Sequence, residues 1–271
     1  MKPLRGIRIG IIGTGKMGQA LIKGLRARGL SGKRLVVTDA DSTVLRQVSR
    51  KYQVSAVDTI QSVAASADVV ILAVKPQQLP EVTTILDAFV RRRILVVSIA
   101  AGITTQWLAK HLAGVALARV MPNLPATLGV GFSAITFGKA VSARERATAK
   151  AIFGAVGEVV EVPERFFDAI TAVSGSGPAY VFFLIHAWEM AARRLKLPPA
   201  VAAKAIRQTL IGSLELLRAS SESPEVLISK VASRGGTTEA ALKVLSDRRV
   251  LQNFCDALKA AARRSKQLSW I

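Results

Sequence analysis

A glycine-rich turn near the start of the chain narrows the possible folds more than any other segment does. It follows a short apolar run over residues 7–12 and precedes helical spacing over residues 19–28. The pattern G-x-G-x-x-G between a strand and a helix is typical of a dinucleotide-binding βαβ unit. Its glycines make the tight turn, let the backbone approach a pyrophosphate and let helix and strand pack closely. The turn and its expected cofactor-binding residues are Gly13, Thr14, Gly15, Lys16, Met17 and Gly18.

Strand and helix signals alternate over residues 1–163, which we expect to form a Rossmann-type dinucleotide-binding domain. The runs at 69–74 and 94–99 are wholly apolar, as expected for parallel strands that are covered on both faces. Ser142 and Glu145 predict a capping box for a helix that ends near Phe153. The other expected elements are strands at 34–38, 117–121, 132–137 and 156–162 and a helix at 42–52. This alternation predicts an α/β fold with a doubly wound, mostly parallel sheet.

Strand signals end after Pro163, and residues 164–271 predict an all-helical domain. The expected helices cover residues 167–195, 199–218, 224–232, 238–245 and 251–267. They are more apolar than a small isolated helical domain requires. Because obligate interfaces resemble a core cut in half, we expect these C-terminal helices to form a dimer interface.

The charge and composition of the chain argue against several classes of function. The net charge of +20 first suggests a nucleic-acid partner. The basic residues are spread over the whole chain, however, and aromatic residues for base stacking make up only 5%. The densest basic run, Arg91-Arg92-Arg93, follows an apparent helix, where cations complement the helix dipole. One cysteine, Cys255, and two distant histidines predict no metal site and no internal disulfide.

The mean hydropathy of +0.35 raises the possibility of a membrane protein. The longest stretch without charge covers residues 169–188 and contains Ser174-Gly175-Ser176-Gly177-Pro178, which we expect to break a bilayer-spanning helix. The apolar part of the N-terminus is too short for a signal peptide. We therefore expect a cytoplasmic protein with neither a membrane nor a nucleic acid as its partner.

Two further loops follow buried strands and are candidates for cofactor binding, because ligands of open α/β sheets lie at the carboxyl ends of the strands. The first is Ala73-Val74-Lys75-Pro76, in which the lysine is the one charged residue and the proline stops the strand. The second contains Ala100, Ala101 and Gly102, whose small side chains would let backbone approach a nicotinamide. The alternatives are a solvated loop lysine and ordinary turn chemistry.

Three loops are candidates for substrate binding. Asn123 is the versatile hydrogen-bonding residue of a proline-bounded loop over residues 119–125, and Ser176 lies in the glycine-rich bend. The third loop, Ser233-Arg234-Gly235-Gly236-Thr237-Thr238, precedes a helix. The last two loops could be anion-binding nests or plain helix caps. None of these loops offers an obvious general acid or base, which favours hydride transfer to a protonated C=N bond over oxidation of an alcohol.

With these motifs in place, the chain resembles the pyrroline-5-carboxylate reductase family over essentially its full length. The most specific match is the Gly235-Gly236-Thr237-Thr238 signature, with Pro224 before it and Ala241-Leu242 after it. The glycine turn and residues 73–76, 119–125 and 174–180 match in the same order and spacing. One departure is Arg234, which replaces a proline that is usual in the family.

The resemblance implies reduction of 1-pyrroline-5-carboxylate to L-proline, the last step of proline biosynthesis, with NADPH or NADH. It implies that the Thr238 hydroxyl contacts the ring nitrogen of the substrate, while Ser233, Gly236 and Thr237 hold its carboxylate. It also implies homodimers through the C-terminal helices and further assembly into decamers. Two alternatives stay open: a reductase of another small carboxylated imine or hydroxy acid, and a dinucleotide-sensing protein without catalytic activity.

The preference between the two cofactors depends on Thr38 and Asp39, at the end of the second expected strand. Asp39 lies 21 residues after Gly18, where an acidic residue binds the ribose hydroxyls of NAD and repels a 2′-phosphate. The Thr38 hydroxyl could instead bind the 2′-phosphate of NADPH. We expect both cofactors to be used, with NADH relatively better than in typical relatives. The alternative is that Asp39 faces solvent and caps the next helix.

Overall fold

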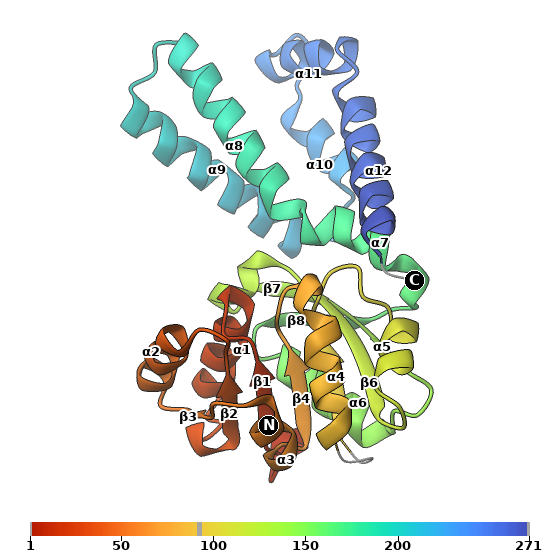
Figure 1. The fold of residues 1–271 in the computed structure, drawn as a ribbon. Coiled ribbons are helices and arrows are strands. Elements are labelled where there is room, and N and C mark those ends of the chain that lie inside the picture. The colour runs from red at the N-terminus through yellow and green to blue at the C-terminus, as the bar shows by residue number, and fades with distance from the viewer. Residues whose placement is uncertain (1, 91–93, 270–271) are drawn as a thin grey trace. The chain divides into compact units, whose positions relative to one another are not determined.

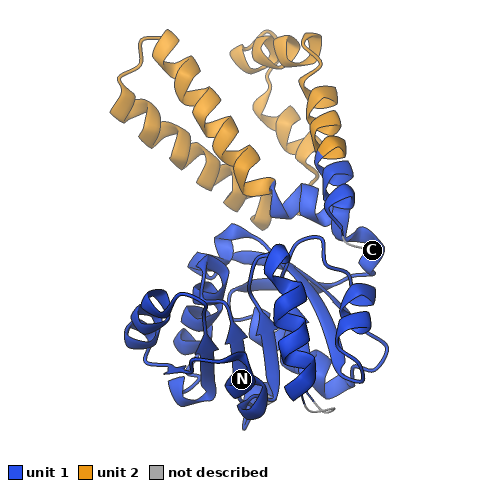
Figure 2. Ribbon diagram, viewed as in Figure 1, with its two compact units in different colours: residues 1–176, 261–271 blue, residues 177–260 orange. Residues whose placement is uncertain are grey.

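The structure is a computed structural model and describes residues 2–90 and 94–269. It forms two compact units, one made of residues 1–176 and 261–271 and the other of residues 177–260 (Figure 2). The basic run Arg91-Arg92-Arg93 lies outside the described residues. The first compact unit ends its N-terminal segment at Ser176, whereas the sequence predicts a domain boundary after Pro163. Compact units and domains are defined differently, so the domain boundary after Pro163 stays a prediction.

The first unit is built on an eight-stranded sheet with the strand order β3-β2-β1-β4-β5-β6-β7-β8 (Figure 1). Neighbouring strands are parallel except for β6 and β7, which pair antiparallel. The strands are β1 (Ile9–Ile12), β2 (Leu35–Thr38), β3 (Ser55–Ala56), β4 (Val69–Leu72), β5 (Leu95–Ser98), β6 (Ala116–Pro122), β7 (Gly131–Phe137) and β8 (Gly157–Glu161). The predicted doubly wound, mostly parallel sheet is confirmed.

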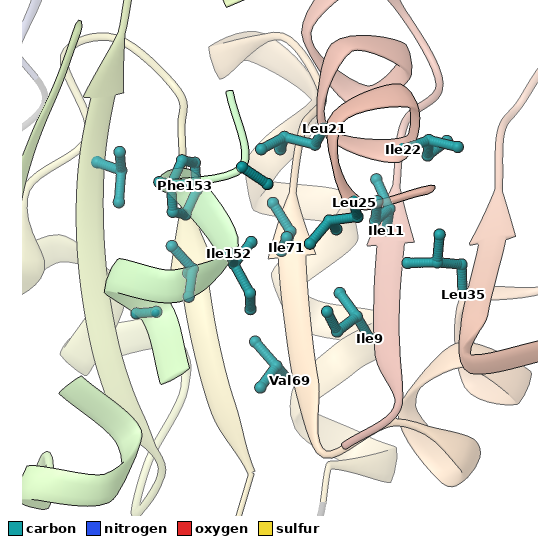
Figure 3. Close-up of a cluster of buried hydrophobic side chains, with 14 of the residues drawn as sticks. Ile9, Ile11, Leu21, Ile22, Leu25, Leu35, Val69, Ile71, Ile152 and Phe153 are labelled. Carbon is teal, nitrogen blue, oxygen red and sulfur yellow. The ribbon is translucent and has the colours of Figure 1, made fainter. Parts of the chain in front are cut away.

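Helices cover both faces of this sheet. They are α1 (Lys16–Ala27), α2 (Ser42–Tyr52), α3 (Ile60–Ser66), α4 (Leu79–Phe89), α5 (Thr105–His111) and α6 (Ala143–Phe153). One buried cluster joins α1, α2 and α6 to the sheet, and a second joins α3, α4 and α5 to its other face. Successive strand residues point to opposite faces, so Ile11 belongs to the first cluster (Figure 3) and Ile12 to the second. Each fully buried Ile or Leu side chain contributes roughly 1.5–3 kcal/mol.

Local caps fix where several of these helices begin. The Asp41 side chain accepts hydrogen bonds from the amides of Thr43 (2.8 Å) and Val44 (3.2 Å) at the start of α2. Ser142 and Glu145 form the predicted capping box of α6. Such caps satisfy backbone donors that have no partner within the helix.

The helical part of the chain continues from α7 (Phe167–Ile170) through a π-helical turn (Thr171–Gly175) into α8 (Gly177–Arg194). The expectation that the segment 174–178 breaks this helix was therefore wrong. Ser174 and Gly175 form part of the π-helical turn. Pro178 lies in the first turn of α8, where a backbone donor is not needed, so the helix tolerates it. By length and composition alone, the continuous helix Glu164–Arg194 could cross a membrane.

The second unit contains α8, α9 (Pro199–Ala219), α10 (Pro224–Val231), α11 (Thr237–Asp247) and the first part of α12 (Val250–Leu268). Within it, α8 packs against α9 around Ala192, Ala202 and Ile206, which form its one cluster of buried apolar residues among those described. Many large apolar side chains are exposed in the single chain, including Phe183 and Leu251. This unit therefore lacks a core of the size found in the first unit.

Candidate active site

The glycine turn has the geometry that a bound pyrophosphate requires. Gly13 has φ +96°, and a Cβ on it would lie 2.7 Å from the Ala73 carbonyl oxygen. A Cβ on Gly18 would lie 2.3 Å from the Gly13 carbonyl oxygen, so only glycine allows α1 to pack this closely. By contrast, nothing lies within 4 Å of a Cβ built on Gly15. The backbone at Gly15 is thus open to a ligand, and the turn fits a dinucleotide phosphate.

The start of α1 supplies backbone donors beside this opening. Gly15 is the N-cap residue, and no side chain caps the helix. The first intrahelical bond runs from Gln19 to Gly15, so the amides of Lys16, Met17 and Gly18 have no carbonyl partner within the helix. Free amides at a helix start, together with the helix dipole, attract a phosphate.

Asp39 connects the end of β2 to the glycine turn. Its Oδ2 accepts hydrogen bonds from the Thr14 amide (2.6 Å) and the Thr14 hydroxyl (2.8 Å), and its Oδ1 accepts one from the Asp41 amide (3.0 Å). Thr14 is fully buried. The alternative in which Asp39 caps the next helix is wrong, because Asp41 caps α2.

A pocket of about 520 Å³ opens at the carboxyl ends of β1, β2 and β4. The predicted cofactor residues that line it are Gly13, Gly15, Thr38, Asp39, Ala73, Val74 and Lys75. Its walls also include Asp58, Thr59, Ile60, Gln61, Gln78, Glu81, Val82 and Ile85, which the sequence analysis missed. The lining carboxylates of Asp39, Asp58 and Glu81 outnumber its one ammonium group, on Lys75. The pocket is thus locally acidic within a strongly basic chain.

The other predicted cofactor residues do not line this pocket. Thr14, Lys16, Met17, Gly18 and Pro76 belong to the turns and helix starts beside it. Ala100, Ala101 and Gly102 follow β5, farther along the sheet edge. A Cβ on Gly102 would lie 2.5 Å from the Leu268 carbonyl oxygen, so the structure gives this glycine a packing role against the end of α12.

Two of the predicted substrate residues lie in the first unit. The Asn123 side chain accepts a hydrogen bond from the Phe132 amide (2.8 Å) and donates one to the Ser174 hydroxyl (3.1 Å). It therefore fixes the loop after β6 against the π turn. The Ser176 amide donates to the Thr171 carbonyl oxygen (2.8 Å) and closes that turn.

The remaining predicted substrate residues form a turn at the start of α11, in the second unit. Gly236 is the N-cap residue and no side chain caps the helix, so the alternative of a plain serine or threonine cap is wrong here. The Gly236 amide donates to the Ser233 carbonyl oxygen (3.0 Å), and the Gly235 amide donates to the Glu239 carboxylate (2.6 Å). The backbone donors left for an anion are therefore those of the first helical turn, at Thr237, Thr238 and Glu239.

Two family models match the chain. Residues 164–268 match the model for pyrroline-5-carboxylate reductase dimerisation, and residues 8–102 match a model described as NADP oxidoreductase, coenzyme F420-dependent. The first of these covers the predicted dimerisation helices. The second covers the glycine turn and the pocket.

Relatives match over nearly the whole chain. The pyrroline-5-carboxylate reductase of Synechocystis is 41% identical over 97% of this chain and 98% of its own length, and that of Arabidopsis thaliana is 34% identical over 98% and 97%. Among solved structures, the Coxiella burnetii reductase has a TM-score of 0.91 at 35% identity, covering 98% of this chain and 99% of that chain. The Plasmodium falciparum reductase, solved with NADP bound, has a TM-score of 0.88 at 25% identity over the same shares.

Proposed function

Because this chain belongs to the pyrroline-5-carboxylate reductase family, we propose that it reduces 1-pyrroline-5-carboxylate to L-proline with NADPH or NADH. The observation that carries the proposal is the uncapped helix start at Gly236–Thr238, which leaves amides and a threonine hydroxyl free for a carboxylated imine. The glycine turn of the same chain has backbone open to a dinucleotide. The chain thus offers sites for both reactants.

The cofactor would be held mainly by backbone. The amides of Lys16, Met17 and Gly18 would face its phosphates, and the residues after β4, from Ala73 to Lys75, would form the opposite wall. When bound, the nicotinamide supplies a hydride for the imine carbon. We keep Ala100, Ala101 and Gly102 as candidates for the nicotinamide side, because they follow the next strand of the sheet edge.

The locally acidic pocket supports a further proposal on the choice of cofactor. The Asp39 carboxylate follows β2, where a ribose is bound in Rossmann folds. With Asp58 and Glu81 it would repel the added negative charge of a 2′-phosphate. The enzyme therefore uses both cofactors, with NADH relatively better than in typical relatives.

The substrate would be held by the turn before α11. The amides of Thr237 and Thr238 and the Ser233 hydroxyl bind its carboxylate, while Gly235 and Gly236 shape the turn rather than donate to the ligand. The Thr238 hydroxyl contacts the ring nitrogen. Because a protonated imine that accepts hydride at carbon becomes a neutral amine, no side chain has to remove a proton in this step. Asn123 and Ser176 order the loops of the first unit.

The test is an assay with 1-pyrroline-5-carboxylate and each cofactor, in which proline formation should exceed turnover of other imines and hydroxy acids. Thr238→Ala should lower kcat about tenfold or more, because one polar contact made in the transition state is worth roughly 1.4 kcal/mol. Thr238→Ser, which keeps the hydroxyl, should stay within about threefold of the wild type. Unchanged kinetics in Thr238→Ala would remove this hydroxyl from the mechanism. Tight dinucleotide binding without turnover would favour a sensing protein.

We further propose that the chain forms a cytoplasmic homodimer through its C-terminal helices, with further assembly into decamers and neither nucleic acid nor membrane as a partner. We also keep the predicted domain boundary after Pro163. The match to the dimerisation model supports it, because that match begins at residue 164. The exposed apolar side chains of α8 to α12 support the proposed dimer.

A further inference from the structure

The turn before α11 has a defined type. It spans Ser233–Gly236 and is closed by the hydrogen bond from the Gly236 amide to the Ser233 carbonyl oxygen (3.0 Å). Gly235, its third residue, has φ +74°, whereas Arg234, its second residue, is not among the described residues with positive φ. A negative φ followed by a φ near +80° defines a type II β-turn.

The orientation of the central peptide distinguishes this turn from the commoner type I. Going from type I to type II changes ψ of the second residue by about 150°, which turns the amide of the third residue to the other side. Proline at the second position usually restricts such a turn, but here that position holds Arg234, whose φ is not fixed by a ring. With arginine at this position, the orientation of the central peptide is therefore less restrained than it would be with proline.

Glu239 supplies the missing restraint. It is the third residue of α11, and its Oε2 accepts a hydrogen bond of 2.6 Å from the Gly235 amide, the amide of the central peptide. A bond from a backbone amide to an ionised carboxylate is stronger than one between neutral groups. In a type I turn this amide would point away from the carboxylate, so the hydrogen bond selects type II.

We propose that Glu239 is a positioning residue, which holds the turn Ser233–Gly236 in the type II form and thereby orders the donors of Thr237 and Thr238 before substrate binds. The inference rests on the proposed function, because it assumes that these donors bind the substrate. The competing interpretation is that the Glu239 carboxylate occupies a place needed by the substrate carboxylate. The two interpretations predict opposite effects of removing the side chain.

The experiment measures kcat and KM for 1-pyrroline-5-carboxylate in four variants and the wild type. Glu239→Ala should raise KM about three- to tenfold with a smaller change in kcat, because part of the binding energy then orders the turn. Glu239→Gln keeps an acceptor oxygen and should stay within about twofold of the wild type. Adding Arg234→Pro to Glu239→Ala should recover most of the loss, since proline fixes the same turn. Asp247→Ala, which removes an exposed carboxylate from the same helix, should leave KM unchanged.

Amide hydrogen exchange at Gly235 gives a readout that does not need activity. Exchange should quicken at least about threefold in Glu239→Ala but not in Glu239→Gln or Asp247→Ala. A lower KM in Glu239→Ala would support the competing interpretation and overturn the proposal. So would a Glu239→Gln variant as impaired as Glu239→Ala, because the charge at the helix start would then matter rather than the hydrogen bond. If the wild type shows no turnover while hydrogen exchange behaves as expected, the proposed function fails. The role of Glu239 in holding the turn through its hydrogen bond to the Gly235 amide then still stands.

Discussion

At the residue scale, the two oxygens of the Asp39 carboxylate have different partners. Its Oδ2 is occupied by the amide and hydroxyl of buried Thr14, which fixes the glycine turn. Its Oδ1 accepts one hydrogen bond from the Asp41 amide and keeps room for a second donor such as a ribose hydroxyl. The net charge of +20 would favour NADPH at long range, but salt screens this attraction beyond roughly 8–10 Å. We therefore expect the local carboxylates to decide the preference.

Replacing this carboxylate should change the choice of cofactor. Asp39→Ser should raise the ratio of kcat/KM for NADPH to that for NADH about tenfold, the effect of removing one charge interaction of roughly 1.4 kcal/mol. The ratio is the proper measure, because loss of the hydrogen bonds to Thr14 should weaken the binding of both cofactors by the same factor. Asp41→Asn is the matched control, since asparagine also caps α2 and residue 41 does not line the pocket. A wild type strongly selective for NADPH, with a ratio unmoved by Asp39→Ser, would show that Asp39 does not contact the ribose.

At the scale of elements, an ion pair ties the segment after β8 to the sheet. Arg119 on β6 pairs with Glu164 at 3.0 Å, and its guanidinium lies 4.5 Å from the centre of the Phe167 ring. Glu164 also accepts hydrogen bonds from the amide and hydroxyl of Thr105, at the start of α5. Because the Arg119 side chain is only 5% exposed, its charge depends on this partner.

Neutralising Glu164 should therefore destabilise the protein. We expect Glu164→Gln to lower the free energy of unfolding by about 2–4 kcal/mol, somewhat below the cost of breaking a fully buried pair, because Glu164 is 28% exposed. Urea unfolding at a fixed protein concentration measures this change. Glu161→Gln is the control, because Glu161 pairs with Arg146 and Lys150 at the surface and should cost less than about 1 kcal/mol. If both variants lost the same free energy of unfolding, the burial of Arg119 would not make its ion pair more important for stability than a surface pair.

The elements that the sequence predicted are those with strong local signals. The helix at residues 42–52 and the capping box at Ser142 appear in the structure as expected, because periodicity and caps act within a few residues. The helices α3 and α5 were not predicted, since seven residues span less than two full turns and show little periodicity. The segment 174–178 was misjudged because glycine and proline signals do not distinguish a π turn from a break.

The sequence predicts candidate site residues only in segments where these residues are close in sequence. The glycine turn and the turn before α11 carry recognisable spacings. Asp58 and Glu81 were missed because only the folded sheet brings them to the pocket. The bond from Gly235 to Glu239 had a sequence signal, since a glutamate at the third helical position often binds a backbone amide just before the helix.

At the scale of the whole molecule, the second unit cannot bury its own apolar surface. Its single cluster of buried apolar residues, among those described, consists of three side chains. Phe182, Phe183 and Leu184, on consecutive positions of α8, are 60%, 73% and 52% exposed in the single chain. Exposed apolar surface of this extent marks an interface. Since residues 164–268 match a dimerisation model, we expect a second copy of the chain to cover this surface.

A charge on this surface should therefore dissociate the assembly. Phe183→Asp removes a large apolar contact and places an unpaired carboxylate in the interface, so the dissociation constant should rise at least about 100-fold. Sedimentation at micromolar concentration should then show a smaller species than the wild type. Phe89→Asp is the matched control, because Phe89 is 52% exposed in the first unit, at the end of α4. Phe183→Asp with the mass of the wild type would contradict this interface, and flotation of the wild type with lipid vesicles would assign the exposed face of α8 to a membrane instead.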